Sequence, residues 1–317
     1  MKLNYSLKQS TIIDDMNVLV IGIGNIGRIH LRNLQKNKKI KIFVNDKRKL
    51  DLREKILKNT KNIGLSKKEI IENKIDFALI CTPSKNHFLL AKKLILLGIP
   101  VLIEKPMVLK FDEFRSLEEL GKQHNVFIMC GFVERYHNAI TFIKKELIDQ
   151  ELIYFESKRH SIQPDDSRAL DTIKFDTLIH DIDLLNFLKP NLNLKKLLVK
   201  EYNETALAIY NSKNFSASLA SSRISQNKIR EITLMTKKFQ YDIDLIKNTI
   251  SIYVHRGVEM LQDRPFYKIF NEKELLQLEK TESIMHEQNY FFDEGFRGFN
   301  QELFDSYKFS HFSLFSS

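Results

Sequence analysis

The sequence predicts a two-domain α/β protein, with a doubly wound parallel sheet first and an α+β domain with a mainly antiparallel sheet second. Three observations carry this prediction. A glycine-rich turn joins a strand to a helix near residue 22, and strands and helices then alternate up to about residue 131. Beyond that point strand-like segments follow one another without helices between them. The 317 residues suffice for two domains of ordinary size, expected at 1–131 and 132–317.

The first element is an apolar run, NVLVI, followed at once by GIGNIG and by a segment with helical spacing. Gly22 permits a tight turn, Gly24 lets the backbone approach a diphosphate, and Gly27 lets the helix pack close to the strand. The helix N-terminus supplies N–H groups and a positive dipole end. This order of strand, turn and helix is the context of the dinucleotide fingerprint of a Rossmann domain. A flavin or another nucleotide stays an alternative ligand.

The next strand, IKIFVND, ends in Asp46, about 20 residues beyond the last glycine. A carboxylate there accepts hydrogen bonds from the adenosine ribose hydroxyls and repels a ribose phosphate, so it favours NAD. Lys47 and Arg48 follow directly and offer positive charge to such a phosphate. NADP therefore stays open.

The rest of the first domain alternates regularly. A central strand at 75–81 leads into the loop TPSKNH, and the following segments are a helix at 87–98 with Gly98 as its C-cap, a strand at 99–106, a helix at 111–124 and a strand at 125–132. Lys105 stands at the end of its strand, just before Pro106. In open α/β sheets ligands bind outside the carboxyl ends of the strands, so this lysine is a candidate for chemistry.

The second half changes pattern. Helices are predicted at 136–148 and 175–188, and strands at 194–202, 205–211, 215–224, 228–236, 239–245 and 249–254, with NSKN as a hairpin signal. In the second helix, Asp176, His180 and Asp183 are spaced four and three residues apart, which predicts one helical face. Residues 1–16 are predicted to be a leader strand or arm.

Composition excludes several classes of protein. The net charge of +10 comes from scattered lysines, which argues against a nucleic-acid groove and suits a phosphorylated substrate or cofactor. The apolar runs are too short to span a bilayer, and the N-terminus lacks a signal peptide, so we predict a cytoplasmic protein without membrane contact. Cys81 and Cys130 lie in apolar strands and offer neither a disulfide framework nor a zinc site. No metal is predicted.

Four segments together resemble the Gfo/Idh/MocA oxidoreductases, the glucose-fructose oxidoreductase and inositol dehydrogenase group: GIGNIG at 22–27, CTPSKNHFLLAKKLILLGIPVLIEKP at 81–106, GFVERYHNAI at 131–140 and DTLIHDID at 176–183. The resemblance covers nearly the whole chain. It implies an NAD-binding Rossmann domain, Lys105 as the active-site lysine, and Asp176 and His180 as the Asp-x-x-x-His pair. It also implies a Lys105–Pro106 bond that is often cis.

The resemblance implies further site residues. Cofactor contacts are expected from Gly22, Gly24, Asn25, Ile26, Gly27, Asp46, Lys47, Arg48, Thr82, Pro83, His87, Glu104 and Lys105, and substrate contacts from Arg135, Tyr136 and Asp183. The chain departs from the family at Ile179, where a glycine is common, and at Asn138, where a proline is common. From about residue 290 the chain begins like the family's last helix and then turns into a tail rich in Ser and Phe, so the helix and the segment expected after it are shortened or replaced.

The implied reaction is oxidation of a secondary hydroxyl of a sugar. GF-x-ERY combined with IHDID resembles the branch that acts on nucleotide-activated amino sugars in surface glycan biosynthesis, forming a 3-keto sugar. The alternatives are an inositol or free-sugar dehydrogenase, a non-catalytic NAD-binding sugar sensor and an NAD-dependent glycosidase. A homodimer or homotetramer is expected, joined through the open face of the second domain's sheet.

Overall fold

The computed structural model describes residues 15–48, 55–162, 171–190, 193–255, 258–260, 267–269 and 272–315. The chain divides into two compact units, Met1–Gly131 with Ile284–Asp305, and Phe132–Ser283 with Ser306–Ser317. Residues 284–305 therefore lie in the first unit, whereas the sequence predicts them in the second domain. Most of the predicted N-terminal arm, residues 1–14, lies outside the described residues.

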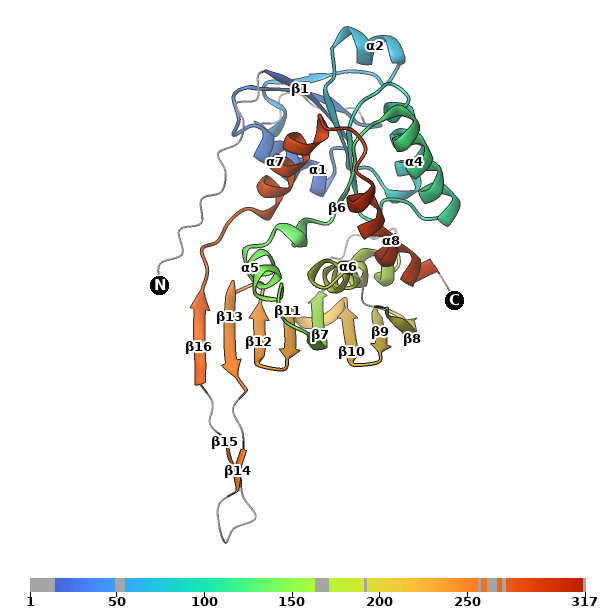
Figure 1. The fold of residues 1–317 in the computed structure, drawn as a ribbon. Helices are drawn as coiled ribbons and strands as arrows, with labels where there is room; N and C mark the ends of the chain where they lie inside the picture. Colours follow the sequence, from blue (N-terminus) through green and yellow to red (C-terminus); the bar gives the residue numbers. More distant parts are fainter. Residues whose placement is uncertain are drawn as a thin grey trace. The chain divides into compact units, whose positions relative to one another are not determined.

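The first unit contains a six-stranded parallel sheet with the order β3-β2-β1-β4-β5-β6 (Figure 1). Its strands are β1 (Met16–Ile21), β2 (Ile40–Asn45), β3 (Thr60–Asn62), β4 (Phe77–Ile80), β5 (Val101–Glu104) and β6 (Ile128–Gly131). The chain moves outward from β1 to β3 and then, on the other side of β1, from β4 to β6. The predicted doubly wound sheet is confirmed, and the reversal beside β1 is where such sheets bind ligands.

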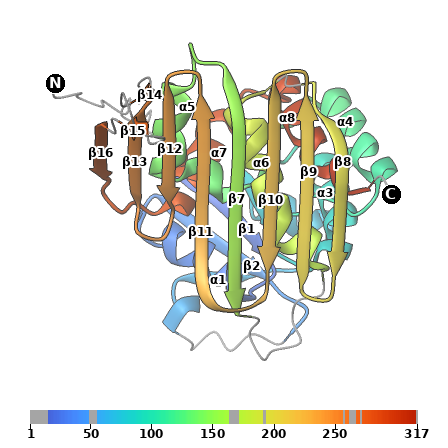
Figure 2. The ribbon, with the colours of Figure 1, turned by 90° about the horizontal axis from the view of Figure 1, so that it is seen from below.

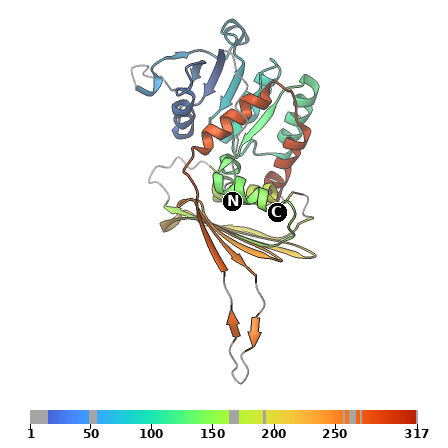
Figure 3. The ribbon, with the colours of Figure 1, turned by 60° about the vertical axis from the view of Figure 1, so that its left-hand side comes forward.

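The connecting helices are α1 (Asn25–Leu34), α2 (Lys67–Glu72), α3 (His87–Ile95) and α4 (Phe111–His124). Figures 1 and 3 show α1 on the opposite face of the sheet from α4, as right-handed crossovers in both directions from β1 require. Gly98 ends α3 as predicted. Its φ is +75°, its N–H donates to Ile95, and the N–H of Ile99 donates to Leu94, which satisfies the last carbonyls of the helix.

A helix from the far end of the sequence completes this unit. In α7 (Ser283–Gly295) and just after it, the rings of Phe291, Phe292 and Phe296 surround Phe77 of β4, with centroids 4.8 to 5.3 Å from its own. A Cβ on Gly295 would meet the Phe77 ring at 2.3 Å, so the helix approaches the strand closely. This aromatic contact explains why residues 284–305 belong to the first unit.

The second unit contains an eight-stranded sheet with the order β16-β13-β12-β11-β7-β10-β9-β8 (Figure 2). Among the described strands the pairing is antiparallel, apart from the parallel pair of β7 with β10. The strands are β7 (Leu152–Ile162), β8 (Lys195–Tyr202), β9 (Thr205–Ser212), β10 (Phe215–Ser222), β11 (Ile224–Thr236), β12 (Phe239–Asp244), β13 (Thr249–Val254) and β16 (Glu272–Gln277). The mainly antiparallel sheet and the NSKN hairpin between β9 and β10 are confirmed.

Helices α5 (Asn138–Glu146) and α6 (Ile179–Leu188) lie on one face of this sheet (Figure 2). A two-stranded ribbon, β14 (Val258–Met260) with β15 (Tyr267–Ile269), lies beyond the ends of β13 and β16 (Figure 3). None of the helices that the structure describes has both the length and the apolar character needed to cross a bilayer.

The central strand β7 is absent from the prediction, and its buried face explains why. Ser157 and Arg159 on that face are 1% and 5% exposed, so the apolar alternation typical of a strand is missing. Arg159 donates hydrogen bonds to Asp181 of α6 and to Glu134. An arginine can stand at this buried position because its charge is paired with two buried carboxylates.

The C-terminal tail forms a 15-residue helix, α8 (Gln301–Phe315), where the sequence predicts a shortened or replaced helix. Its serines supply hydrogen bonds inside the second unit. Ser306 Oγ accepts from Arg135 Nη1 at 2.9 Å, and Ser310 Oγ donates to Asp183 at 2.9 Å. The serines of this tail therefore complete a buried polar cluster.

Candidate active site

The glycine turn between β1 and α1 has the geometry of a diphosphate cradle. Gly22 has a φ of +92°, and a Cβ on Gly27 would lie 2.0 Å from the carbonyl oxygen of Gly22, so both positions require glycine. A Cβ on Gly24, by contrast, meets no heavy atom of the described residues within 4 Å. The open space lies at the N-terminus of α1, whose first residues are Asn25 and Ile26. A diphosphate fits there against backbone N–H groups and the positive end of the helix.

Asp46, just after β2, is tied to this turn. Its Oδ2 accepts a hydrogen bond from the N–H of Ile23 at 2.7 Å. Arg48 donates to the same carboxylate from its main chain, Nε and Nη2 at 2.8 to 3.0 Å, and from Nη2 to the carbonyl of Ile23 at 2.9 Å. These hydrogen bonds from Arg48 lower the pKa of Asp46 to about 2. The carboxylate is thus ionised and beside a guanidinium, while Lys47 is exposed.

The loop after β4 is fixed by His87, the first residue of α3. The Nε2 of His87 lies 2.7 Å from the carbonyl oxygen of Thr82, and its Nδ1 lies 2.9 Å from that of Pro106. His87 is 1% exposed, so it joins the Thr82–Pro83 loop to the segment after Lys105 from inside the unit. The hydroxyl of Thr82 is buried and has no hydrogen-bond partner among the described residues. It is suited to a bound ligand.

Lys105 follows β5 directly and is half-buried. The Lys105–Pro106 peptide bond is cis. The neighbouring Glu104 turns into the protein, where its Oε1 lies 2.8 Å from Nε2 of His30 in α1. Glu104 therefore links the end of β5 to the helix whose N-terminus forms the cradle.

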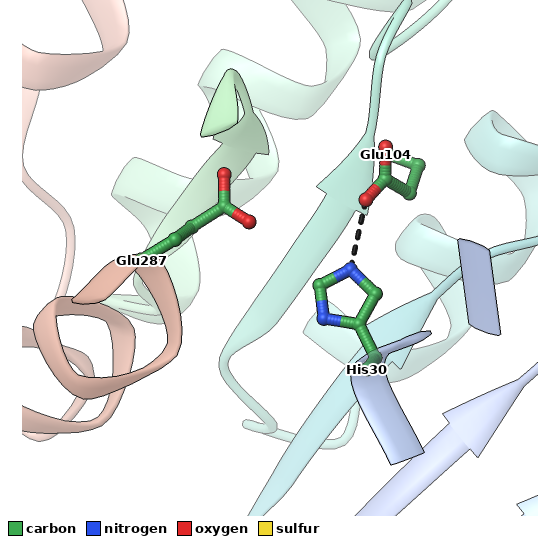
Figure 4. Close-up of side chains that lie close together, drawn as sticks. All are labelled: His30, Glu104 and Glu287. Atoms are coloured by element: carbon green, nitrogen blue, oxygen red, sulfur yellow. Dashed lines mark hydrogen bonds and ion pairs between the residues drawn. The ribbon is translucent and has the colours of Figure 1, made fainter. Parts of the chain in front are cut away.

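His30, Glu104 and Glu287 form a buried cluster, with one possible ligand atom from each lying within 4.8 Å of the others (Figure 4). Gln288 Nε2 lies 2.9 Å from Nδ1 of His30 and 3.2 Å from its carbonyl oxygen. An amide that donates to both atoms makes Nδ1 an acceptor, so the ring proton lies on Nε2 and points at Glu104. In this tautomer Nε2 has no lone pair for a metal. The hydrogen bonds therefore favour a proton on Nε2 over a metal ion at this cluster.

In the second unit, Asp176 and His180 occupy the entry to α6. Residues Lys174–Leu178 form a π-helical turn, and the α-helix begins only at Ile179. The helix predicted through Asp176, His180 and Asp183 is present, but its first turn, which contains Asp176, is π-helical. π turns inside helices often occur at functional sites. The imidazole of His180 is half-buried, and its ring meets the edge of Phe132 with centroids 6.4 Å apart.

Asp176 binds an arginine that the sequence prediction missed. Arg223, between β10 and β11, donates from Nη1 to Asp176 Oδ2 at 3.1 Å and from Nε to Glu204 Oε2 at 2.6 Å. The Asp176 side chain is 40% exposed, whereas that of Arg223 is 7% exposed. No local pattern marks Arg223, because its partners come from other elements.

Arg135 and Asp183, predicted to contact substrate, bind each other instead. The Nε of Arg135 donates to Asp183 Oδ2 at 2.7 Å, and their side chains are 4% and 1% exposed. Burial opposes the charge of Arg135, but the Asp183 carboxylate outweighs it and raises the arginine pKa. The guanidinium also lies 4.7 Å from the ring centroid of Tyr307. A buried and fully engaged pair favours a positioning role, while Tyr136 stays half-buried at the same turn.

Residues 16–132 match the family model of the Gfo/Idh/MocA group, described as an oxidoreductase family with an NAD-binding Rossmann fold. The match spans the parallel sheet and the glycine turn. The first unit of the chain is thus similar to the NAD-binding domain of the Gfo/Idh/MocA oxidoreductase family.

The chain is similar to the UDP-N-acetylglucosamine 3-dehydrogenase of Acidithiobacillus ferrooxidans. The two are 24% identical over 250 residues, which cover 76% of this chain and 78% of that protein. A solved structure of that enzyme covers 88% of both chains with a TM-score of 0.71 and 23% identity. The myo-inositol 2-dehydrogenase of Thermotoga maritima is 27% identical over 186 residues, or 55% of this chain and 54% of its own.

A levoglucosan dehydrogenase in complex with NADH and levoglucosan has the same fold. Its TM-score is 0.73 at 15% identity, over 94% of this chain and 95% of its own. The likeness of fold to these dehydrogenases thus extends through the second unit, beyond the residues that the family model matches.

Proposed function

We propose that this protein is an NAD-dependent dehydrogenase that oxidises a secondary hydroxyl of a nucleotide-activated amino sugar to a ketone. One observation carries the proposal: the lysine at the end of β5 and the Asp-x-x-x-His pair at the entry to α6 occur together in a chain that matches a UDP-N-acetylglucosamine 3-dehydrogenase over 76% of its length. A dinucleotide-binding sensor has no need of a base, so retention of Lys105, Asp176 and His180 supports an enzyme.

The residues of the first unit fit the cofactor. The open space at Gly24 takes the diphosphate, the ionised Asp46 takes the ribose hydroxyls, and the buried hydroxyl of Thr82 lies on the loop at the carboxyl end of β4. We assign NAD rather than NADP because a carboxylate at Asp46 repels a ribose phosphate. NAD, when bound, would supply the acceptor for the hydride that leaves the substrate carbon.

The chemistry of the side chains follows from the same proposal. His180 removes the hydroxyl proton as the C–H bond gives up its hydride and the C=O bond forms. Lys105 donates a hydrogen bond to the reacting oxygen and stabilises its developing negative charge. Asp176 orients the imidazole. A histidine suits this role because its ordinary pKa of about 6.5 leaves it neutral and basic at physiological pH.

The sugar-nucleotide part rests on the relative's substrate and on the net charge of +10, which favours a diphosphate. The test is incubation with NAD and a panel of UDP- and GDP-sugars beside free inositol and glucose, followed by the absorbance of NADH. We expect turnover of a UDP-amino sugar. Turnover of free inositol or glucose alone would contradict the sugar-nucleotide assignment and favour the inositol dehydrogenase relatives.

Two further outcomes separate the other classes. NADH binding without net cofactor reduction on any sugar indicates a sensor. Release of a sugar from a glycoside, with NAD required but no NADH accumulating, indicates a glycosidase. Either result overturns the dehydrogenase assignment.

We also propose a homodimer or homotetramer formed through the outer face of the second unit's sheet. Apolar side chains are exposed on its strands, among them Ile153, Leu207 and Leu275 at 37%, 37% and 62%. Light scattering on the purified protein measures the mass of the assembly, and a monomer at micromolar concentration contradicts the proposal.

A further inference from the structure

We propose that Arg223 is a positioning residue for catalysis. Its hydrogen bond to Asp176 holds that carboxylate in the place from which it orients His180. This inference rests on the proposed function, because it assigns Asp176 and His180 their catalytic roles. It names a residue outside the four segments that carry the family resemblance.

The guanidinium of Arg223 bridges two carboxylates. Its Nε donates to Glu204 at 2.6 Å and its Nη1 to Asp176 at 3.1 Å, with a longer contact from Nη1 to the carbonyl of Asp171 at 3.4 Å. The N–H of Arg223 also donates to the carbonyl of Glu204 at 2.8 Å. Arg223 is therefore anchored to the turn between β8 and β9 through both its main chain and its side chain.

The exposures of the two side chains show which residue holds the other. Arg223 is almost completely buried, while the Asp176 side chain is 40% exposed. Glu204 fixes the buried guanidinium, and the Asp176 carboxylate that it holds is the more exposed of the two groups. Because a guanidinium is planar and donates in fixed directions, it sets the orientation of the carboxylate.

The π turn makes this anchoring necessary. A π turn accommodates one residue more than an α turn, and relaxing it to α geometry would rotate the preceding residues by about 100° around the helix. Asp176 would then turn about the helix axis relative to Arg223. The turn is held from the sheet at two points: Arg223 binds Asp176, and Glu201 of β8 accepts from the N–H of Lys174 at 3.4 Å.

The test uses the full chain with Arg223→Gln, Arg223→Lys and Glu204→Gln. The matched control is Arg230→Gln, which removes another arginine–carboxylate pair of the same sheet, 3.1 Å from Glu134, without touching Asp176. We expect Arg223→Gln to lower kcat about ten- to a hundredfold with little change in KM for NAD, since a misplaced catalytic group slows chemistry and not cofactor binding. Arg223→Lys should recover part of the loss, and Arg230→Gln should retain wild-type kcat.

A second readout needs no turnover. In histidine-labelled protein the His180 ring resonance, assigned by its absence in His180→Gln, should shift in Arg223→Gln and stay in place in Arg230→Gln. An unchanged His180 resonance, or a kcat loss equal to that of Arg230→Gln, overturns the positioning role. Should Arg223→Gln fail to fold, Arg223→Lys and Glu204→Gln carry the same two readouts. Wild-type protein without turnover rejects the proposed function, while the His180 resonance still decides the role of Arg223.

Discussion

The glycine turn of the first unit and the entry to α6 in the second each present functional groups, but they are built differently. The turn consists of main chain: three glycines, a helix N-terminus, and Asp46 bound to the N–H of Ile23. The entry to α6 is held by side chains that lie far from it in the sequence, Arg223 and Arg159 among them. We expect changes in the turn to act on cofactor affinity, and changes around α6 to act on chemistry or stability.

The largest expected effect separates chemistry from binding. Lys105→Ala should lower turnover by about a thousandfold or more, because the developing oxyanion loses its charged donor. Its affinity for NADH, measured by the cofactor's fluorescence, should stay within about threefold of wild type. Lys110→Ala, an exposed lysine in the same segment, is the control. An equal loss of NADH affinity would instead make Lys105 a cofactor contact.

The next effect concerns the buried ion pairs behind α6. Arg159→Met leaves Asp181 and Glu134 without the arginine that binds both, so unfolding in urea should show a loss of about 3 to 5 kcal/mol. The half-exposed pair of Arg230 with Glu134 provides the control, and Arg230→Met should cost less than about 1 kcal/mol. Equal losses would show that burial of the pair does not decide its contribution.

The stability of the second unit should also depend on pH through His311 of α8. Burial lowers the pKa of His311 from 6.5 to about 4, so the folded protein keeps this ring neutral while the unfolded chain protonates below pH 6.5. Its contribution to stability is therefore complete above pH 6.5 and declines as pH falls to 4, by at most about 1.4 kcal/mol per pH unit. His311→Gln should flatten the fall of Tm in this window. An unchanged slope of Tm against pH in this variant would show that other groups cause the loss of stability in acid.

Within the turn, two glycines should give opposite results. Gly24→Ala adds a Cβ to open space, so the protein should fold normally and bind NADH about tenfold more weakly. Gly27→Ala places a Cβ 2.0 Å from the carbonyl oxygen of Gly22, so it should lower Tm. Thermal melts and NADH titrations on the same samples separate the two effects. An unchanged NADH affinity in Gly24→Ala would contradict the assignment of the diphosphate site to this turn.

The smallest effect is a change of preference between NAD and NADP. Arg48→Ala should raise the ratio of the NADPH to the NADH dissociation constant by about fivefold, since a ribose phosphate loses its cation. Asp46→Ser should lower that ratio by a similar factor, because the repelling carboxylate is gone. Both constants come from fluorescence titrations. Movement of both variants in the same direction would contradict separate roles for the two side chains.

The difference between the two regions also explains what the sequence predicts. Gly22, Gly24 and Gly27 act through local backbone geometry, so spacing alone places them, and the parallel sheet follows from alternating apolar strands. Arg223 acts through Glu204 and Asp176, which adjoin it only after the strands pair. No short window of sequence contains that information.

Two other misses have the same cause. β7 carries Arg159 on its buried face, and its partners Glu134 and Asp181 lie elsewhere in the chain. In the sequence the serines of α8 look like polar residues of an exposed tail. Their role is visible only from their hydrogen bonds with Arg135 and Asp183. Polar side chains that are buried in pairs look exposed in a sequence.

The return of α7 to the first unit has a consequence for how the protein is made. The aromatic cover of Phe77 comes from residues synthesised after every strand of both sheets. A nascent chain synthesised as far as Gly131 already holds the whole parallel sheet, yet it lacks Phe291 and Phe292. We therefore expect the first unit to be the first begun and among the last completed on the ribosome, unlike a chain whose domains fold one after the other.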